Sequence, residues 1–282
     1  MNWEKLIRFK DSPLGVPNEI PLAIMSNKLR EKITVVLSGE GADELMGGYG
    51  RIFRSPFDFS NSKEDQSFYD YFINLYDYVP RSIRKSYLSS ESKFKSYFDN
   101  QIRSESINYS NEEFVFRYFH KYHIKGLLQR VDMTTMQTSV EARVPFLDHN
   151  LVDFSYSCIP YDLKLKWNSK KSLLKAKNSN SAVYSEVLDT PKYLLRQVGR
   201  KLLPEKIIDR RKVGFPVPLS DWFGDLESMA NDYLVNVNWL KNDSINGLIK
   251  MSKNHTRSGQ ILWMFLNIEM FKNNYFNKEW RW

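Results

Sequence analysis

The chain has a single cysteine, Cys158, among its 282 residues, so an internal disulfide is excluded and a reducing compartment is expected. It contains no run of 18 or more apolar residues, which argues against a membrane span. The charged N-terminal residues are not followed by an apolar stretch, so no secretory signal is predicted. Together these absences predict a cytoplasmic protein.

Common metal and nucleotide motifs are also missing. The four histidines, at positions 120, 123, 149 and 255, have no cysteine partners at zinc-binding spacing. No Gly-Lys-Ser/Thr segment follows a glycine-rich loop, which excludes a Walker loop. The dinucleotide fingerprint is excluded because Glu44 stands where a third glycine would be.

Basic residues exceed acidic ones by 41 to 33, which gives a net charge of +8 and raises the question of nucleic-acid binding. The basic runs at 81–85, 164–171 and 210–212 are short and scattered, as on a solvated surface. We therefore predict no nucleic-acid partner. Salt-sensitive retention on DNA would favour that alternative instead.

The most informative segment is VVLSGEGADELMGGYGR, residues 35–51. Residues 33–37 predict a buried parallel strand, which runs into a loop with four glycines and the acids Glu40, Asp43 and Glu44. Glycine allows close backbone approach to a ligand, and free N–H groups bind anionic oxygens. Because α/β proteins bind ligands at such strand ends, we favour a ligand site over a simple tight connection.

The remaining pattern is mainly helical. Helices are predicted over residues 21–31 and 68–76, and a capping box formed by Ser110 and Glu113 predicts another helix start. Residues 241–259 are polar and are expected to form a mobile region. Only one clear parallel strand is visible, so its sheet neighbours are expected from sequence outside this chain.

Four segments, in this order, resemble the glutamine-dependent asparagine synthetase family: SGEGADELMGGYGR (38–51), DMTTMQTSVEARVPFLDHNLVDF (132–154), KYLLRQVGRKLLPEKIIDRRKVGFPVPLSDWF (192–223) and GQILWMFLNIEMF (259–271). They span nearly the whole chain and resemble the C-terminal part of the synthetase domain. The family's Ser-Gly-Gly-x-Asp-Ser pyrophosphate-binding loop is not found here. Its glutaminase domain, which begins with a cysteine, is not found either.

The resemblance implies an α/β fold. Residues 1–55 would be a remnant of an adenine-nucleotide alpha-hydrolase-like (ATP pyrophosphatase) layer that carries the SGEGADE loop. Residues 56–282 would be the mainly α-helical remainder of the synthetase domain.

The resemblance also implies ATP-dependent amide formation. Aspartate or a similar carboxylate would be activated as an acyl-adenylate and attacked by ammonia from glutamine. The expected cofactors are ATP and Mg²⁺. The expected partners are a glutaminase domain or free ammonia, and another chain that supplies the pyrophosphate loop.

Site residues follow from the resemblance position by position. Ser38, Gly39 and Gly41 would bind the nucleotide. Glu40 matches a glutamate of the acyl-transfer step, and its carboxylate would accept a proton as ammonia adds.

Two further residues would act on the phosphates. Asp43 matches an acid near the magnesium, which prefers hard oxygen ligands. Lys192 matches a lysine that contacts phosphate oxygens, where a cation stabilises the leaving pyrophosphate. Arg196, one helical turn on, is expected to reach the same face and to add to an anion-attracting field.

The roles of Arg130, Asp132, Glu141, Arg143 and Asp148 stay open. They could bind substrate, or they could form a buried charge network that joins helices to the nucleotide layer, and we favour the structural role. Residues 214–216 are expected to form a rigid loop, and Trp222 is expected to pack.

Two other functions stay open. The chain could be a catalytically inactive scaffold or binding remnant of the family. It could also be a related amidoligase that acts on another carboxylate, such as a sugar acid or a peptide side chain. In each case the unpaired edge of the strand over 33–37 predicts poor solubility or association with another chain.

Overall fold

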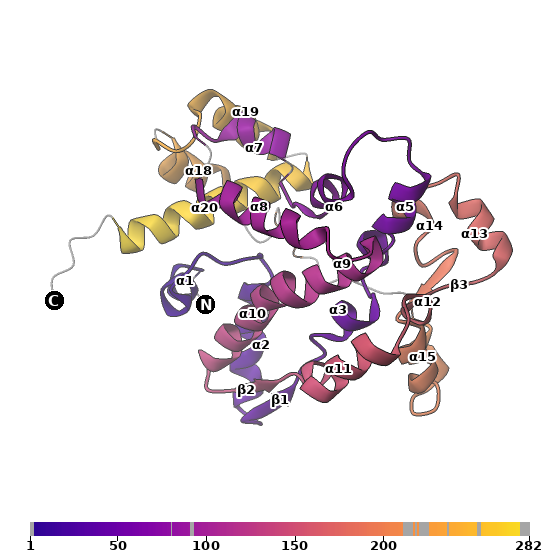
Figure 1. Ribbon diagram of the computed structural model, residues 1–282. Coiled ribbons are helices and arrows are strands. Elements are labelled where there is room, and N and C mark those ends of the chain that lie inside the picture. Colours follow the sequence, from indigo (N-terminus) through magenta and orange to yellow (C-terminus); the bar gives the residue numbers. More distant parts are fainter. Residues whose placement is uncertain are drawn as a thin grey trace.

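The computed structural model describes residues 3–79, 81–90, 93–210, 226–235, 237–252 and 255–276, together with residues 217 and 219. Helices make up most of this part of the chain (Figure 1). The elements of the first half are α1 (Trp3–Lys10), α2 (Glu19–Arg30), β1 (Val35–Leu37), α3 (Ala42–Met46), α4 (Gly50–Phe53), α5 (Ser55–Asn61), α6 (Phe68–Tyr76), α7 (Arg81–Tyr87), α8 (Lys93–Ser106), α9 (Asn111–Tyr118), the π-helix η1 (Phe119–His123) and α10 (Ile124–Met136).

The second half continues with short elements around two further strands. They are β2 (Glu141–Arg143), the 3-10 helix η2 (Pro145–Leu147), α11 (His149–Cys158), α12 (Tyr161–Lys164), β3 (Leu165–Trp167), α13 (Lys170–Ala176), α14 (Ser181–Tyr184), β4 (Asp189–Pro191), α15 (Tyr193–Gly199), α16 (Glu205–Ile208), α18 (Leu226–Leu234), α19 (Asn242–Ser252) and α20 (Thr256–Tyr275).

The parallel strand predicted over 33–37 is shorter than expected and is not buried. β1 pairs in parallel with β2, with Val36 opposite Ala142. The sequence analysis was therefore wrong to leave this strand without a partner in the chain. It was also wrong about burial, because Val35 is 42% and Leu37 70% exposed. The second pair, β3 with β4, is antiparallel.

The helical predictions agree better with the structure. α2 and α6 occupy the predicted ranges, and the Ser110 hydroxyl accepts the N–H of Glu113 to cap α9. The polar stretch over 241–259 was expected to be mobile, and this expectation was wrong. Most of its described part forms α19 and the start of α20. Ile245 and Leu248 of α19 are buried, and this apolar stripe explains why the helix packs despite its polar composition.

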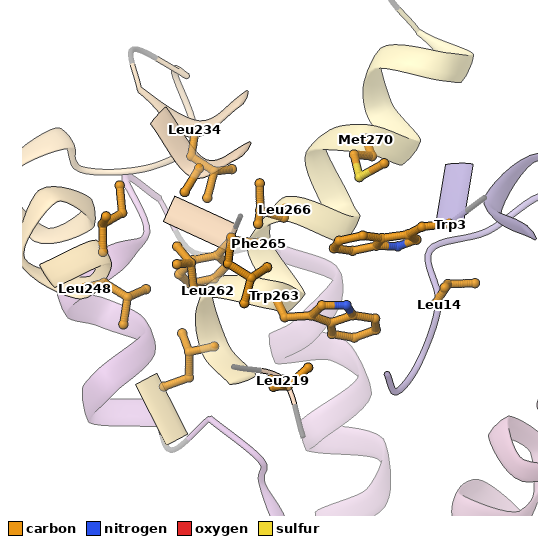
Figure 2. Packing of buried hydrophobic residues seen from close by; sticks show 14 of the residues in the cluster. Trp3, Leu14, Leu219, Leu234, Leu248, Leu262, Trp263, Phe265, Leu266 and Met270 are labelled. Atoms are coloured by element: carbon orange, nitrogen blue, oxygen red, sulfur yellow. The ribbon is translucent and has the colours of Figure 1, made fainter. Parts of the chain in front are cut away.

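The largest hydrophobic cluster joins the two ends of the chain. α1 packs on α20, where the rings of Trp3 and Trp263 stack with centroids 5.5 Å apart (Figure 2). The indole N–H of Trp3 donates to the side-chain oxygen of Asn267 at 3.1 Å. This cluster contains residues from both sides of position 55, and the division into 1–55 and 56–282 stays a prediction.

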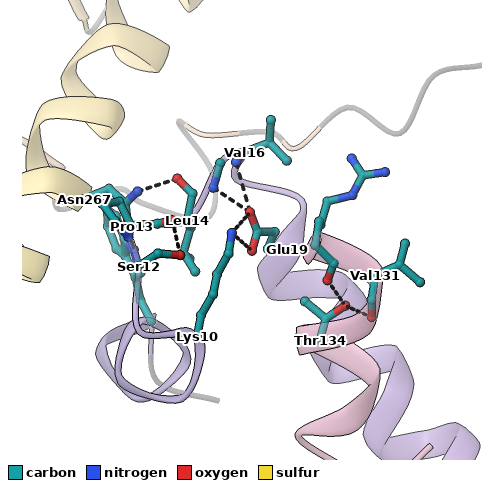
Figure 3. Close-up of polar contacts among 12 residues, drawn as sticks. Lys10, Ser12, Pro13, Leu14, Val16, Glu19, Val131, Thr134 and Asn267 are labelled. Atoms are coloured by element: carbon teal, nitrogen blue, oxygen red, sulfur yellow. Dashed lines mark hydrogen bonds and ion pairs between the residues drawn. The ribbon is translucent and has the colours of Figure 1, made fainter. Parts of the chain in front are cut away.

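A buried ion pair fixes the turn between α1 and α2. The Lys10 ammonium lies 2.9 Å from Glu19, and their side chains are 3% and 0% exposed (Figure 3). Glu19 also accepts the N–H of Gly15 at 2.5 Å. The Asn267 amide of α20 donates to the carbonyl of Leu14 at 2.5 Å, so the same turn is tied to the C-terminal helix.

A second cluster consists of aromatic side chains from α4, α6, α9 and η1. Phe53 and Phe72 are fully buried, and Phe53 packs on Phe119 with ring centroids 4.7 Å apart. These rings fill a core together with aliphatic residues such as Ile102 and Leu165. A smaller cluster of Leu45, Met46 and Ile159 packs α3 against the end of α11 and so positions the loop before α3.

β4 is anchored by a second buried ion pair. Arg54 is 2% exposed on its side chain, and its Nε donates to Asp189 at 2.7 Å. Its Nη2 donates to the carbonyl of Leu165 at 2.9 Å, and its guanidinium lies 3.9 Å from the Trp167 ring centre. β4 leads directly into Lys192, so this anchor also positions that lysine.

We expect Asp189→Ala to destabilise the chain by about 3–5 kcal/mol, because it leaves the Arg54 charge buried without its partner. Urea unfolding followed by circular dichroism measures the change. The matched control is Asp153→Ala, which removes an exposed carboxylate from α11. Equal losses for the two variants would contradict the proposed anchor.

Candidate active site

The loop between β1 and α3 is shaped by glycine. Gly41 has φ 95°, and a Cβ there would lie 2.5 Å from the Cγ of Leu147. Only glycine avoids both the strain and the collision. The loop begins where Ser38 N–H donates to the carbonyl of Arg143 at 2.7 Å, which continues the β1–β2 ladder.

Glu44 holds this loop from the inside. Its side chain is fully buried, accepts the Gly41 N–H at 3.0 Å and accepts the Tyr49 hydroxyl at 2.7 Å. Burial raises the pKa of Glu44, while the Tyr49 hydrogen bond opposes that shift. Glu44 therefore braces the loop backbone. The sequence analysis noted this acid but assigned it no partner.

Asp43 meets Lys192, as the resemblance implied for two residues of one site. The Lys192 ammonium lies 2.8 Å from the Asp43 carboxylate, and the two side chains are 24% and 25% exposed. Lys192 has φ 53°, a left-handed backbone conformation that residues other than glycine rarely adopt. Such strain persists where the surrounding structure enforces it, and it is concentrated at functional sites.

Gly48 makes room for Asp43. A Cβ on Gly48 would lie 1.6 Å from the Asp43 carboxylate oxygen and 2.8 Å from its Cα. Because the second contact is with backbone, rotation of a side chain could not relieve it. The sequence analysis counted this glycine in the loop without finding its role. The Gly47-Gly48 pair after a short helix was the available signal.

Glu40 meets Arg130 of α10. The Arg130 guanidinium lies 2.6 Å from the Glu40 carboxylate, and their side chains are 14% and 20% exposed. Arg130 thus joins α10 to the loop, and its structural role as opposed to a substrate-binding one stays a prediction. Glu40 Oε2 makes no hydrogen bond to another residue of the described part of the chain.

The other charged candidates do not join this cluster. Asp132 is exposed, Glu141 pairs with Arg143 at the surface at 2.8 Å, and Asp148 caps α11 through the N–H of Asn150. The predicted buried network was wrong for these four. The alternating pattern of a surface strand puts Glu141 and Arg143 on one exposed face of β2.

Arg196 also has a different role from the one expected. Its guanidinium donates to the carbonyls of Pro191 and Ile208, at 3.1 and 2.5 Å, and so ties α15 to the residues around it. The predicted loop at 214–216 lies outside the described residues. So do Trp222 and the basic residues at 211 and 212.

Aromatic rings and an imidazole pack behind the loop. His123 ends the π-helix η1, a distortion often found at functional sites. Its ring contacts those of Tyr49 and Phe119, and its Nδ1 lies 2.9 Å from the Tyr76 hydroxyl. Burial, assisted by the charge of Arg130, lowers the pKa of His123 to about 4.

A cavity of about 690 Å³ borders the loop on the Gly48 side. Its lining includes Gly48, Tyr49, Tyr76, Ser185 and Arg257. It therefore brings the end of the glycine-rich segment next to α6 and α14. Gly48 is the link between this cavity and the loop, because its N–H donates to the carbonyl of Asp43 at 2.8 Å, but Asp43 and Lys192 themselves are not among the lining residues.

The side chains around Asp43 offer few ligands for a metal. Within the described residues, no group of three or more His, Cys, Asp or Glu side chains is placed to hold one. Asp43 offers one partly exposed carboxylate. Mg²⁺ commonly takes one or two protein carboxylates together with substrate phosphates, so this single ligand fits a metal that arrives with a nucleotide.

Comparison with known proteins agrees with the motif order. The asparagine synthase family profile matches residues 1–272. The chain therefore belongs to the asparagine synthase family, and the resemblance noted in the sequence is confirmed.

Curated relatives carry the same name. Asparagine synthetase (glutamine-hydrolyzing) 1 of Bacillus subtilis (strain 168) is 29% identical over 265 residues, which cover 83% of this chain and 38% of that protein. A putative asparagine synthetase of Mycobacterium tuberculosis (strain CDC 1551 / Oshkosh) is 25% identical over 264 residues, covering 77% of this chain and 35% of that protein. The chain thus spans less than two fifths of the length of these relatives. None of its described helices is long and apolar enough to cross a membrane.

Gly48→Ala should displace Asp43 from Lys192 and destabilise the chain by about 1–3 kcal/mol, the usual range for overpacking. Thermal and urea unfolding measure this. Gly247→Ala is the matched control, because a Cβ there meets nothing within 4 Å and lies in α19. The explanation fails if both variants are equally stable.

His123 should make stability fall with acid. Its folded pKa of about 4 lies below its ordinary 6.5, so the unfolded chain binds more protons in this window. This contribution is complete above pH 6.5 and is lost as pH falls toward 4, by at most about 3 kcal/mol. Urea unfolding from pH 7 to 4 measures it.

His123→Phe should flatten that pH dependence, since phenylalanine does not titrate. His149→Phe is the control, because the His149 side chain is 84% exposed. It should keep the pH dependence of the unchanged chain. Indistinguishable slopes for the His123 variant and the unchanged chain would contradict the buried neutral imidazole.

Proposed function

We propose that this chain is the C-terminal portion of an ATP-dependent amide-forming enzyme of the asparagine synthetase type, acting in the cytoplasm. A carboxylate of aspartate would be activated as an acyl-adenylate and then attacked by ammonia. The observation that carries the proposal is the convergence of Glu40, Asp43 and Lys192 on one loop, each partly exposed. Family membership supports the reaction class.

The fold supports a missing neighbour. We propose that β1 and β2 belong to a larger parallel sheet of the adenine-nucleotide alpha-hydrolase type, completed by a segment or chain that carries the pyrophosphate loop. In the described part of the chain β1 and β2 form a two-stranded sheet, so each strand has one edge without a strand partner, and such edges are pairing sites. The Leu37 side chain is 70% exposed and offers an apolar surface beside them. Ammonia would come from a glutaminase domain or from solution.

The loop backbone is suited to a nucleotide. Gly39 is exposed, and nothing lies within 4 Å of the position its Cβ would take, so a phosphate or ribose can approach the main chain. Ser38 and Gly41 flank it, and their positions are fixed by β2 and by Glu44. We therefore assign the nucleotide to residues 38, 39 and 41.

Glu40 is assigned as the base of the second step. The nitrogen of ammonia forms a bond to the acyl carbon, and the bond from that carbon to the AMP oxygen breaks, with its electron pair leaving on AMP. The nitrogen must lose a proton, and Glu40 Oε2 is available to accept it. Arg130 holds the other oxygen and fixes the direction of the carboxylate.

Lys192 is assigned to the phosphates. Its side chain is 24% exposed, so its ammonium can exchange Asp43 for an incoming phosphate oxygen. A cation there stabilises the charge that develops on pyrophosphate. Asp43, released from this pair, would be the protein ligand of Mg²⁺, which supplies further neutralisation of the phosphate charge.

A larger acyl substrate is the second candidate. The cavity of about 690 Å³ beside Gly48 far exceeds the size of aspartate, and two arginines, Arg51 and Arg257, are among its lining residues. None of residues 38–43 and Lys192 lines this cavity, so the alternative requires a carboxylate long enough to extend from the glycine-rich loop past Gly48. The two candidates share the adenylation chemistry and differ only in the acid.

Pyrophosphate release tests the proposal. The chain is supplied with a segment bearing the Ser-Gly-Gly-x-Asp-Ser loop, ATP, Mg²⁺, ammonia and either aspartate or a panel of larger carboxylic acids. Lys192→Met should lower the rate of pyrophosphate release about 100-fold or more, because it acts on the adenylation step. Glu40→Gln should lower the rate of amide and AMP formation by a similar factor and leave the first turnover of pyrophosphate release unchanged, because it acts on the second step. Lys201→Met, which removes an exposed neighbouring cation, should leave both rates unchanged.

The acid that supports pyrophosphate release distinguishes asparagine synthesis from a related reaction and from an inactive chain. Release that needs aspartate supports asparagine synthesis, and release that needs a larger acid supports the second candidate. Absence of release with every acid would mean that the chain is an inactive binding remnant. Full activity of both site variants would reject the assigned roles.

A further inference from the structure

A second cavity lies outside the candidate active site. It measures about 220 Å³ and lies between the first turn of α9 and the turn from α11 to α12. Its lining includes Glu112, Phe116, Tyr156, Tyr161 and Lys164. None of the residues assigned to the adenylation site takes part in it.

Lys164 is the unusual member of this lining. It is 4% exposed, and its ammonium lies 4.5 Å from the Phe116 ring centre and 5.2 Å from that of Tyr156. It forms no ion pair with any acid in the described part of the chain. Burial lowers the pKa of Lys164 to about 8. Cation–π contacts offset only part of the desolvation of a buried ammonium.

Both tyrosines and Glu113 of the lining are already engaged in hydrogen bonds. The Tyr156 hydroxyl donates to the carbonyl of Phe116 at 3.1 Å, and the Tyr161 hydroxyl donates to the carbonyl of Phe53. The carboxylate of Glu113 accepts from Arg117 at 2.7 Å. The two tyrosine hydroxyls are therefore already used, and Lys164 is the cation among the lining residues.

We propose that this cavity is a second ligand site, which binds a small organic monocarboxylate with an apolar body. The carboxylate pairs with the Lys164 ammonium, and the apolar body lies against the rings of Phe116, Tyr156 and Tyr161. A charge-assisted hydrogen bond would supply the anion that the buried lysine lacks.

Size and charge restrict the ligand further. A cavity of roughly 150 Å³ binds benzene, so this larger one has room for a benzene ring with a carboxylate. Glu112 also lines the cavity and disfavours a second negative charge on the ligand. These features select a benzoate-like anion over a phosphate or a dicarboxylate such as aspartate.

Benzoate binding to the full chain tests the site, with neutral benzamide as the isosteric probe. Isothermal titration should show saturable benzoate binding at least tenfold tighter than benzamide. Lys164→Met should weaken benzoate binding at least tenfold. Lys166→Met, which removes an exposed lysine from β3, should leave it unchanged.

A second readout separates binding from folding. Replacing a buried charge by an apolar side chain of similar length should not lower stability, so urea unfolding of Lys164→Met should match or exceed the unchanged chain. After ¹³C reductive methylation, the Lys164 signal should shift on benzoate addition. Equal affinity for benzamide, retained affinity in Lys164→Met, or no saturable benzoate binding would each overturn the proposal.

Discussion

The geometry of the candidate active site depends on the lack of a side chain at Gly48. Gly48 leaves room for the Asp43 carboxylate, since a Cβ there would overlap both this group and the Asp43 main chain. In that position Asp43 meets Lys192, which follows β4 and is itself held in a left-handed conformation. The glycine at position 48 thus allows the loop after β1 to meet the segment after β4.

Electrostatic compensation explains how three acids share one short loop. Glu40, Asp43 and Glu44 repel one another, and each is satisfied differently: Glu40 by Arg130, Asp43 by Lys192, and Glu44 by a tyrosine and a backbone N–H. The buried Glu44 is structural. The other two acids are partly exposed, so their cations can be shared with an anionic ligand. Glu44 therefore stabilises the loop, while Glu40 and Asp43 remain accessible to a ligand.

Sequence reasoning found what is local and missed what is distant. The glycine and acid pattern indicated the loop, and helical spacing predicted α2 and α6. β2 was missed because its Glu-Ala-Arg sequence carries no apolar signal and gains its structure only by pairing with β1. Likewise, nothing near Arg130 in the sequence names its partner Glu40, since only the fold places α10 beside the loop.

We propose that residues 38–43 and Lys192 together bind an acyl-adenylate. The most direct measurement is a titration of the ¹⁵N-labelled chain, assembled with its loop-bearing segment, with a non-hydrolysable sulfamoyl analogue of aspartyl-adenylate. The account predicts saturable amide shifts that are largest at Ser38, Gly39, Gly41 and Lys192, and that are lost in Gly48→Ala. Binding that leaves these amides unshifted, or that survives Gly48→Ala unchanged, would contradict it.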